Sequence, residues 1–538
     1  MDLMIVNGKI VTMDVENPLV AAVAVKNGRI VAVGQSDEIL KQKTAQTKII
    51  DLHGKLMLPG FNDSHMHLLG YGSNLQKVDL IKTKSIDDII RTTSDFINNY
   101  QLPKYQWVQG RGWNHHIFPT KEMPNRFDLD QISTDHPIVL YRVCGHVASL
   151  NSKALELMGI IDNPSHIQGG HIDVDVNGQA LGILRENAME LIHSHIPEPS
   201  KDQMKNWIIA AGKKVLEQGI TSVQTDDFVV VPKRYIEIMN AYEELVEDQL
   251  LPVRVYEQSN LPKIAQLLEF LKSYQTGKGD DFFKVGPLKL LTDGSLGART
   301  AYLTSPYADD PTTSGIAVFE QEDLDQSVSL AHNNGMQVAL HAIGDKAIEM
   351  VLNSIEKAMN ENPREDHRHS IIHCQITNNQ LLDRMKKLGV IGLVQPLFVA
   401  TDLHFVEERI GKERAASAYN WRTMIEKNIP IAFGSDAPVE SFNVLDGIYA
   451  AVTRKDLNGF PSIGWLPDQK ITVEDAVYAY TLGAAYASFE ETVKGSITPN
   501  KLADFVVLSE DIFTINPDQI KDVKVEMTFV DGKLVYQR

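Results

Sequence analysis

Short apolar runs alternate with amphipathic, helix-like stretches through most of the chain. Eight of the apolar runs have the character of strands, and each breaks into Gly, Pro or polar residues at its carboxyl end. These runs end near His67, Asp226, Glu257, Asp293, His341, His373, Gln395 and Asp436. Helical patterns separate most of them, at 201–217, 261–274, 324–334, 345–359 and 378–388. Because eight parallel strands, each followed by a helix, form a (β/α)8 TIM-type barrel, we expect an α/β fold with this barrel at residues 60–496.

The two ends of the chain, residues 1–59 and 497–538, carry a different pattern. Short alternating apolar runs are joined there by the turn dipeptides Asn7-Gly8, Asn27-Gly28 and Asp531-Gly532. Asn-Gly and Asp-Gly between alternating runs predict β-hairpins. Since neither end is long enough to bury a core by itself, we predict that both ends pair into one small β-sandwich domain beside the barrel.

One connection is much longer than a barrel requires. Between the first and second predicted barrel strands, residues 71–206 contain strand-like runs at 106–109 and 137–142 and a helical run at 151–158. A structureless connection of this length is implausible in a compact domain. We therefore predict an inserted subdomain after barrel strand 1. Because it leaves from the catalytic end of the barrel, we expect it to cover the substrate pocket.

Composition narrows the class of protein. The 538 residues are 43% hydrophobic and 23% charged, with a net charge of −18, which argues against nucleic acid as a partner. No apolar run approaches the ~20 residues of a membrane span, and the first residues lack the basic start and apolar stretch of a signal peptide. Cys144 and Cys374 are the only cysteines, so there is no disulfide framework. We expect a cytoplasmic protein without a membrane partner.

Candidate metal ligands occur at the ends of the predicted strands. His65 and His67 are two residues apart, so on a strand they project to the same face and can bind one ion. Lys289, His341, His373 and Asp436 follow at the carboxyl ends of later strands, which meet at one mouth of a parallel barrel. Each histidine alone is more often a hydrogen-bonded structural residue. The whole set favours a divalent metal site, with zinc, iron, manganese and nickel all suited to these donors.

Four stretches carry a resemblance to a known family. They are Leu58-Pro-Gly-Phe-Asn-Asp-Ser-His-Met-His67, Asp293-Gly-Ser-Leu-Gly-Ala-Arg-Thr300, His341-Ala-Ile-Gly-Asp345 and Gly434-Ser-Asp-Ala-Pro438. The chain resembles the metal-dependent amidohydrolase superfamily, and more closely the amidohydrolase 3 branch that includes the N-substituted formamide deformylases. The resemblance runs from Gly8 to about Gly532.

The resemblance implies a binuclear centre. His65, His67 and Asp436 would bind one ion, His341 and His373 the other, and a carbamate on Lys289 would bridge them. An ammonium group would repel two cations, whereas carbon dioxide converts lysine into an anion with two oxygens. Lys284 competes for this role, but it lies further from the strand end. Asp436 would also be the catalytic general base, passing a proton from water to the leaving amine.

Weaker candidates are expected to bind substrate. Asp293 shares the parity of Lys289, and Arg299 follows it in the next loop. In the insertion, Trp113 and His146 are candidate pocket residues, together with His115 and His116. His146 ranks first because Gly145-His-Val-Ala-Ser-Leu-Asn151 resembles a recurrent element of the same branch.

These expectations predict a hydrolase that cleaves a non-peptide C–N bond of a small molecule, with an N-substituted formamide as one candidate substrate. A divalent ion serves such a reaction because it lowers the pKa of a bound water to about 7. Two alternatives stay open: a mononuclear, deaminase-like enzyme with His373 as an acid–base group, and a lyase or isomerase on the same scaffold. A non-catalytic binding protein is disfavoured because every expected ligand position is filled. The number of ions and the oligomeric state are open, with a homodimer as one alternative.

Overall fold

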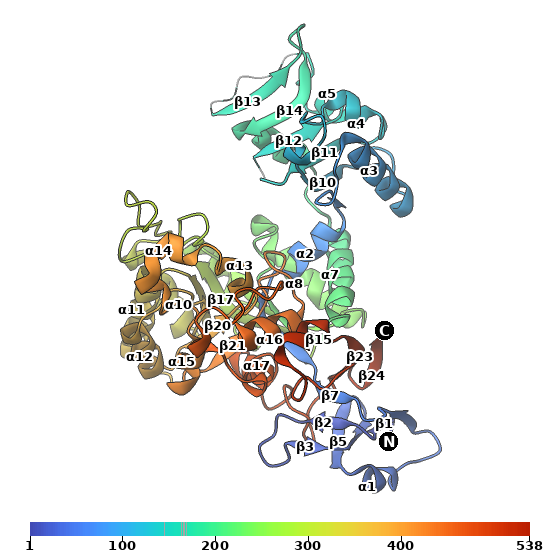
Figure 1. Ribbon diagram of the computed structural model, residues 1–538, viewed down its shortest axis with the longest axis vertical. Coiled ribbons are helices and arrows are strands. Elements are labelled where there is room, and N and C mark those ends of the chain that lie inside the picture. Colours follow the sequence, from blue (N-terminus) through green and yellow to red (C-terminus); the bar gives the residue numbers. More distant parts are fainter. Residues whose placement is uncertain (145, 163, 165–166, 168) are drawn as a thin grey trace. The chain divides into compact units, whose positions relative to one another are not determined.

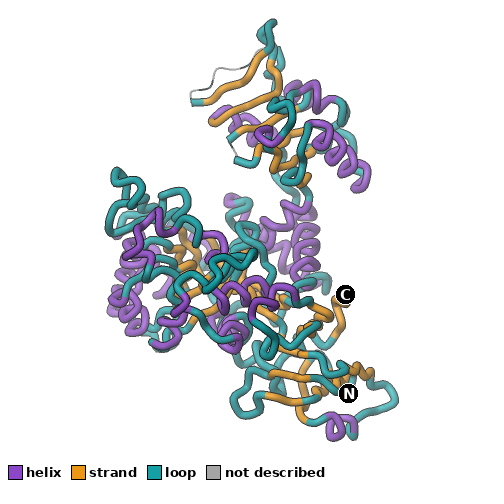
Figure 2. The backbone as a smooth tube through the Cα atoms, in the orientation of Figure 1, coloured by secondary structure: helices purple, strands orange, loops and turns teal. Residues whose placement is uncertain are grey.

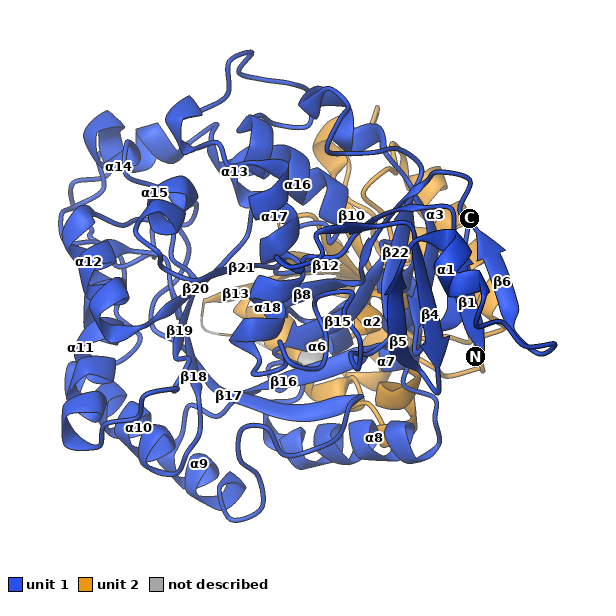
Figure 3. Cartoon of the chain, turned by 90° about the horizontal axis from the view of Figure 1, so that it is seen from below, with its two compact units in different colours: residues 1–71, 208–538 blue, residues 72–207 orange. Residues whose placement is uncertain are grey.

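The chain forms two compact units in the computed structural model, which describes residues 1–538 except 145, 163, 165–166 and 168. The larger unit contains Met1–Tyr71 and Ile208–Arg538, and the smaller one contains Gly72–Trp207 (Figure 3). The sequence placed an inserted subdomain at about 71–206. None of the described helices is long and apolar enough to cross a membrane.

Eight parallel strands form the centre of the larger unit, as the apolar runs predicted. They are β8 (Phe61–Met66), β15 (Ile220–Thr225), β16 (Arg254–Asn260), β17 (Phe283–Leu291), β18 (Val338–Ala342), β19 (Ser370–His373), β20 (Ile391–Val394) and β21 (Ile431–Phe433). Their order in the sheet follows the chain, with β8 and β21 at its two ends. Backbone bonds from Asp436 N to His65 O (2.7 Å) and from His67 N to Ala437 O (2.8 Å) join those two ends. The sheet therefore curls into the predicted TIM-type barrel.

Gly434 allows this close approach of the first and last strands. A Cβ at that position would lie 2.5 Å from the backbone nitrogen of His65. Asp63 completes the joint, because its buried carboxylate accepts hydrogen bonds from the N–H and the hydroxyl of Ser435 and from the N–H of His65. The strand ends that carry the histidine pair and Asp436 are thus held in register.

The helices of the larger unit alternate with these strands (Figures 1 and 2), and most of them lie outside the strand ring (Figure 3). The main ones are α7 (Lys201–Leu216), which begins in the smaller unit, α8 (Tyr235–Glu247), α9 (Ile264–Phe270), α10 (Gln321–Asn333), α11 (Asp345–Glu361), α12 (Asn379–Leu388), α15 (Trp421–Glu426), α16 (Val444–Thr453), α17 (Val473–Ala479) and α18 (Leu482–Ala487). Three further helices are α2 (Leu68–Leu75), α13 (Phe398–Asp402) and α14 (Val406–Ala415).

Local sequence explains where these helices begin and end. In α12 the Asn378 side chain accepts from Leu381 N, and Gly389 ends the helix in a left-handed conformation (φ 68°). In α17 Thr472 and Asp475 form a reciprocal capping box. The apolar side of α11 is buried along the whole helix, which is the amphipathic pattern that predicted it.

Strands from both chain ends share one sheet. A six-stranded sheet has the order β24-β23-β22-β7-β2-β3, and a four-stranded sheet has the order β5-β4-β1-β6. Their bounds are β1 (Leu3–Val6), β2 (Lys9–Val11), β3 (Leu19–Val20), β4 (Ala22–Lys26), β5 (Arg29–Gly34), β6 (Lys48–Asp51), β7 (Leu56–Pro59), β22 (Phe505–Leu508), β23 (Val525–Val530) and β24 (Lys533–Gln537), with the short helix α1 at Ser36–Leu40. Ile5, Val23 and Phe529 belong to one apolar cluster that joins side chains of the two sheets.

Two of the three predicted hairpins are confirmed, and one is wrong. β4 and β5 meet at Asn27-Gly28 (φ 50° and 72°), and β23 and β24 meet at Asp531-Gly532 (φ 52° and 69°). Positive φ at both residues is what a type I′ hairpin turn requires. At Asn7-Gly8 only Asn7 has a positive φ. The chain therefore leaves β1 and enters β2 in the other sheet instead of folding back.

The smaller unit is built on a mixed sheet of order β13-β14-β12-β11-β10-β9. Its strands are β9 (Val78–Asp79), β10 (Val108–Trp113), β11 (Ile138–Arg142), β12 (Val147–Leu150), β13 (Gly170–Val174) and β14 (Ala180–Glu186). Its helices are α3 (Ile86–Tyr100), α4 (Arg126–Asp130), α5 (Ser152–Leu157) and α6 (Glu190–His195). Two apolar clusters, one around Leu140 and one around Leu184, give this unit a core of its own.

Candidate metal centre

Three of the six predicted ligands form a tight cluster. The ligand atoms of His65, His67 and Asp436 all lie within 4.8 Å of one another. Asp436 Oδ1 is 3.3 Å from Nε2 of His65 and 3.1 Å from Nε2 of His67. The two histidines leave β8 on the same face, as their spacing predicted. Asp436 reaches them because a positive φ (60°) turns the chain just after β21.

The other three predicted ligands lie beside this cluster. Nζ of Lys289 is 3.5 Å from Nε2 of His65, and the lysine side chain is buried. The ring of His373 is 5.7 Å from that of His65 and 4.4 Å from that of His341, between ring centroids. All six side chains therefore meet at the carboxyl ends of β8, β17, β18, β19 and β21.

Each imidazole has one nitrogen engaged by a partner outside the cluster. Nδ1 of His65 lies 2.6 Å from Oε1 of Gln258, and Nδ1 of His373 lies 2.7 Å from Oε1 of Gln395. Both glutamines donate their amide NH2 to backbone carbonyls, so Oε1 is the end that faces the ring.

The remaining two rings face backbone carbonyl oxygens. His67 Nδ1 lies 2.7 Å from the carbonyl oxygen of Asp226, and His341 Nε2 lies 3.2 Å from that of Gly294. A ring nitrogen that faces a carbonyl must carry the proton, so the other nitrogen keeps its lone pair. Nε2 of His65, His67 and His373 and Nδ1 of His341 are consequently the nitrogens able to bind a cation.

The pKa values of three histidines and of Asp436 in this cluster are shifted away from their usual values. Burial lowers the pKa of His65 to about 3 and takes that of His373 well below its usual value. Although burial alone would raise it, the contacts with His65 and His67 hold the pKa of Asp436 well below 3.8. Burial opposes a charge on His67, but the contact with Asp436 raises the pKa of His67 to about 9. The site thus favours an ionised Asp436 carboxylate and neutral imidazoles at His65 and His373.

The two weaker candidates of the larger unit are engaged by other groups. Asp293 is buried, and its carboxylate accepts the backbone N–H groups of Tyr302, Ile343 and Gly344, with Oδ1 also 3.3 Å from Nε2 of His341. Arg299 forms a two-pronged ion pair with Asp309 at 3.1 and 2.7 Å. A substrate contact by either residue stays a prediction.

The candidates of the smaller unit differ from each other. Trp113 is fully buried in the apolar core of that unit and donates Nε1–H to the carbonyl of Leu140. A substrate contact by this buried ring stays a prediction. His146 is exposed and pairs with Glu186 at 3.0 Å. Its role in substrate binding stays a prediction, and Gly145 of its motif lies outside the described residues.

Four polar residues of this region were not singled out from the sequence as site residues. Gln258 and Gln395 hold two of the rings, Asp226 holds a third through its carbonyl, and the Asn260 side chain donates to Asp226. The expected end of the third barrel strand at Glu257 placed Gln258 and Asn260 outside the strand, whereas β16 continues to Asn260. Strand parity would have identified both, since alternate residues face the same side.

Known proteins resemble this chain over its whole length. A family profile described as "Amidohydrolase family" matches residues 48–536. YtcJ of Bacillus subtilis is 36% identical, over 99% of this chain and 98% of that protein. N-substituted formamide deformylase of Arthrobacter pascens is 27% identical, over 100% of this chain and 98% of that protein.

A solved structure agrees with these relatives. The crystal structure of an uncharacterized metal-dependent hydrolase from Pyrococcus furiosus has a TM-score of 0.77 and 30% identity, covering 95% of this chain and 100% of that one. The chain belongs to the amidohydrolase family and is a metal-dependent hydrolase of C–N bonds.

Proposed function

We propose that this enzyme hydrolyses a non-peptide amide bond of a small molecule at a centre of two divalent ions, with N-substituted formamides as the first substrate class to test. The observation that carries the proposal is the arrangement of the four imidazoles. In all four rings one nitrogen is held from outside the centre, and Nε2 of His65 and of His67 lies beside Asp436. The formamide class comes from the Arthrobacter pascens relative and applies to this chain only as a hypothesis.

The donor set fits divalent ions. Imidazole nitrogens and carboxylate oxygens bind zinc, iron, manganese and nickel, and zinc is our first choice. His65, His67 and Asp436 would hold one ion, and His341 and His373 the second. Ions bound there supply Lewis acidity that polarises a substrate carbonyl and lowers the pKa of a coordinated water.

Lys289 would bridge the two ions as a carbamate. Among the described residues, no carboxylate lies within salt-bridge distance of Nζ, and burial lowers the pKa of the amine. A buried lysine without a carboxylate partner favours its neutral form, and that form is the nucleophile that combines with carbon dioxide.

Asp436 would move the proton. Its carboxylate stays ionised at neutral pH, because the contacts with two histidines hold its pKa well below the usual range. It can therefore accept a proton from the attacking water and deliver it to the leaving amine nitrogen. The buried outer partners of the rings keep each side chain in place while this happens.

Metal content and the fate of the amine test the proposal. Protein purified without chelator should carry about two divalent ions per chain by plasma mass spectrometry. It should release a primary amine and formate or another acid from a panel of N-formyl and N-acyl amines. Lys289→Ala should lose most of the activity and one or both ions, with partial recovery when short carboxylic acids are added.

Three results would contradict parts of this proposal. One ion per chain that does not increase with zinc and bicarbonate would favour the mononuclear enzyme. Turnover without release of an amine would favour a lyase or isomerase. A Lys289→Ala variant with both ions and full turnover would place the bridge elsewhere.

A further inference from the structure

The backbone of Asp226 is hydrogen-bonded to the strand that carries the histidine pair. Asp226 follows β15 directly and is fully buried. Its N–H donates to the carbonyl of Met66 at 2.9 Å, and its own carbonyl accepts from Nδ1 of His67 at 2.7 Å. The backbone of Asp226 therefore touches the candidate centre, and its side chain is fixed relative to His67.

The Asp226 carboxylate has one engaged oxygen and one free oxygen. Oδ2 accepts from the side-chain amide of Asn260 at 3.0 Å, while Oδ1 is buried without a hydrogen-bond partner among the described residues. Burying a charged oxygen without a partner costs free energy, so such an oxygen indicates a missing or alternative donor.

Lys289 is placed to be that donor. Asn260, which binds the other oxygen, lies directly opposite Lys289 in the register of β16 and β17. Burial raises the pKa of Asp226, and His67 and Lys289 oppose that shift. Burial lowers the pKa of Lys289, and Asp226 opposes that shift more than Asp436 does. Asn260 therefore links the two side chains, because it lies opposite Lys289 and binds Oδ2 of Asp226, although Nζ and the carboxylate are not within salt-bridge distance of each other.

We propose that Asp226 is a positioning residue for Lys289: once Lys289 is carboxylated, the free Oδ1 of Asp226 would accept a hydrogen bond from the remaining Nζ–H. The inference rests on the proposed carbamate. A lysine carbamate keeps one hydrogen on Nζ, and that N–H needs an acceptor on the side away from the ions. With Oδ2 bound to Asn260 and Oδ1 available to the Nζ–H, Asp226 would hold the lysine nitrogen, which lies 3.5 Å from Nε2 of His65, in place. Asp226 would thus favour the carboxylated, bridging form without binding an ion itself.

Carbon-13 NMR in labelled bicarbonate measures the carbamate directly, and plasma mass spectrometry counts the ions in the same sample. The variant is Asp226→Asn, which keeps the shape and removes the charged acceptor. We expect a carbamate signal at least tenfold weaker than in the wild type, and a metal content that falls from about two ions toward one. Thermal unfolding should stay close to that of the wild type.

Two further variants make the test specific. Glu440→Gln removes a partly buried carboxylate that follows the last barrel strand without contact to Lys289, and it should keep the wild-type carbamate signal. Asn260→Ala releases Oδ2 and leaves the charge in place, so it should weaken the signal less than Asp226→Asn does. It also gives a readout if Asp226→Asn fails to fold.

The outcomes separate this inference from the proposed function. A wild type without any carbamate signal would overturn both. A wild-type signal that persists undiminished in Asp226→Asn and in Asn260→Ala would overturn the role of Asp226 alone. Loss of both ions from Asp226→Asn with the carbamate signal intact would make Asp226 a direct ligand, and it too would overturn the positioning role.

Discussion

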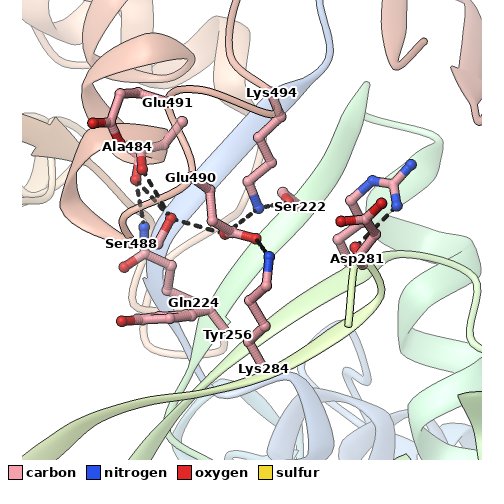
Figure 4. A network of polar contacts seen from close by, with 12 residues as sticks. Ser222, Gln224, Tyr256, Asp281, Lys284, Ala484, Ser488, Glu490, Glu491 and Lys494 are labelled. Atoms are coloured by element: carbon pink, nitrogen blue, oxygen red, sulfur yellow. Dashed lines mark hydrogen bonds and ion pairs between the residues drawn. The ribbon is translucent and has the colours of Figure 1, made fainter. Parts of the chain in front are cut away.

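Two lysines on one strand, β17, lie in opposite electrostatic surroundings: Lys284 is partly buried and Lys289 is fully buried. Lys284, near the amino end of the strand, donates to Glu490 at 2.8 Å, and Lys494 contacts the same carboxylate at 2.6 Å (Figure 4). Ser488 adds a third hydrogen bond to Glu490. Burial alone would raise the pKa of Glu490, but the two lysines lower it to about 2.

Lys289, five residues further along the same strand, faces imidazoles and no carboxylate within salt-bridge distance among the described residues. At the amino end of the barrel, Lys284 and Lys494 thus both pair with the Glu490 carboxylate. Towards the carboxyl end, Asp226 Oδ1 and Glu257 Oε2 are buried without a hydrogen-bond partner among the described residues. The comparison teaches that a buried charge cluster indicates a reactive site when its members lack partners, and indicates stability when they are matched.

The largest effect should come from the reactive end. Asp436→Asn keeps the shape but removes the proton acceptor, so kcat on a competent substrate should fall by about 10²–10⁴-fold. The unfolding temperature should change little, because Asp436 lies at the mouth of the barrel. Steady-state kinetics and thermal unfolding measured together test this, and an Asp436→Asn enzyme within a few-fold of wild type would remove Asp436 from the chemistry.

At the amino end of the barrel, a substitution of Glu490 should lower stability and leave catalysis unchanged. Glu490→Gln leaves Lys284 and Lys494 buried without a counter-charge, and breaking a buried pair in this way costs about 3–5 kcal/mol. We expect a lower denaturant midpoint with kcat per folded enzyme unchanged. Glu269→Gln is the control, since Glu269 pairs with Lys272 on the surface and such pairs contribute about 0–1 kcal/mol. Equal midpoints for the two variants would contradict the comparison.

A third buried cluster is polar without charge and should give the smallest effect. His369 accepts from Val338 N and donates to Nδ1 of His332, which donates to the carbonyl of Asn362, while His367 donates to the carbonyl of Leu388. Burial lowers the pKa of all three rings.

The sign of the pH effect follows from those lowered values. Below the unfolded-state pKa of about 6.5, the unfolded chain takes up protons that the folded chain refuses. The free energy of unfolding should therefore decrease as the pH is lowered below about 6.5. The decrease should be up to about 1.4 kcal/mol per pH unit for each histidine. Denaturation between pH 5 and 8 should show a shallower slope for His369→Gln than for the wild type. His53→Gln, at an exposed histidine, should leave the slope unchanged.

Sequence patterns predicted the barrel because its strands are continuous apolar runs with polar ends. They also placed Lys289 ahead of Lys284, from distance to the strand end alone. The opposite surroundings of the two lysines could not be predicted, since Glu490 lies about 200 residues away along the chain.

The hydrogen-bond partners of the histidine rings could not be predicted from the sequence for a related reason. Gln258 and Gln395 carry no motif, and only the folded geometry reveals that their amide oxygens face His65 and His373. The burial of Trp113 in a core could not be predicted, because a large aromatic side chain is equally suited to a core and to a pocket. At Asn7-Gly8 the dipeptide indicated a turn correctly, but the path of the chain between two sheets depends on long-range pairing.

The sheet shared by the two chain ends has a consequence for synthesis. β7 is complete after Pro59, yet its neighbour β22 begins about 450 residues later. At roughly 5–20 residues per second, a ribosome needs on the order of 20–90 s to supply that partner. During this interval Leu56, Met57 and Leu58 have an open hydrogen-bonding edge and uncovered apolar side chains. The nascent chain therefore has an unpaired, aggregation-prone strand for most of its translation. Chaperones should be needed to protect this segment rather than the barrel.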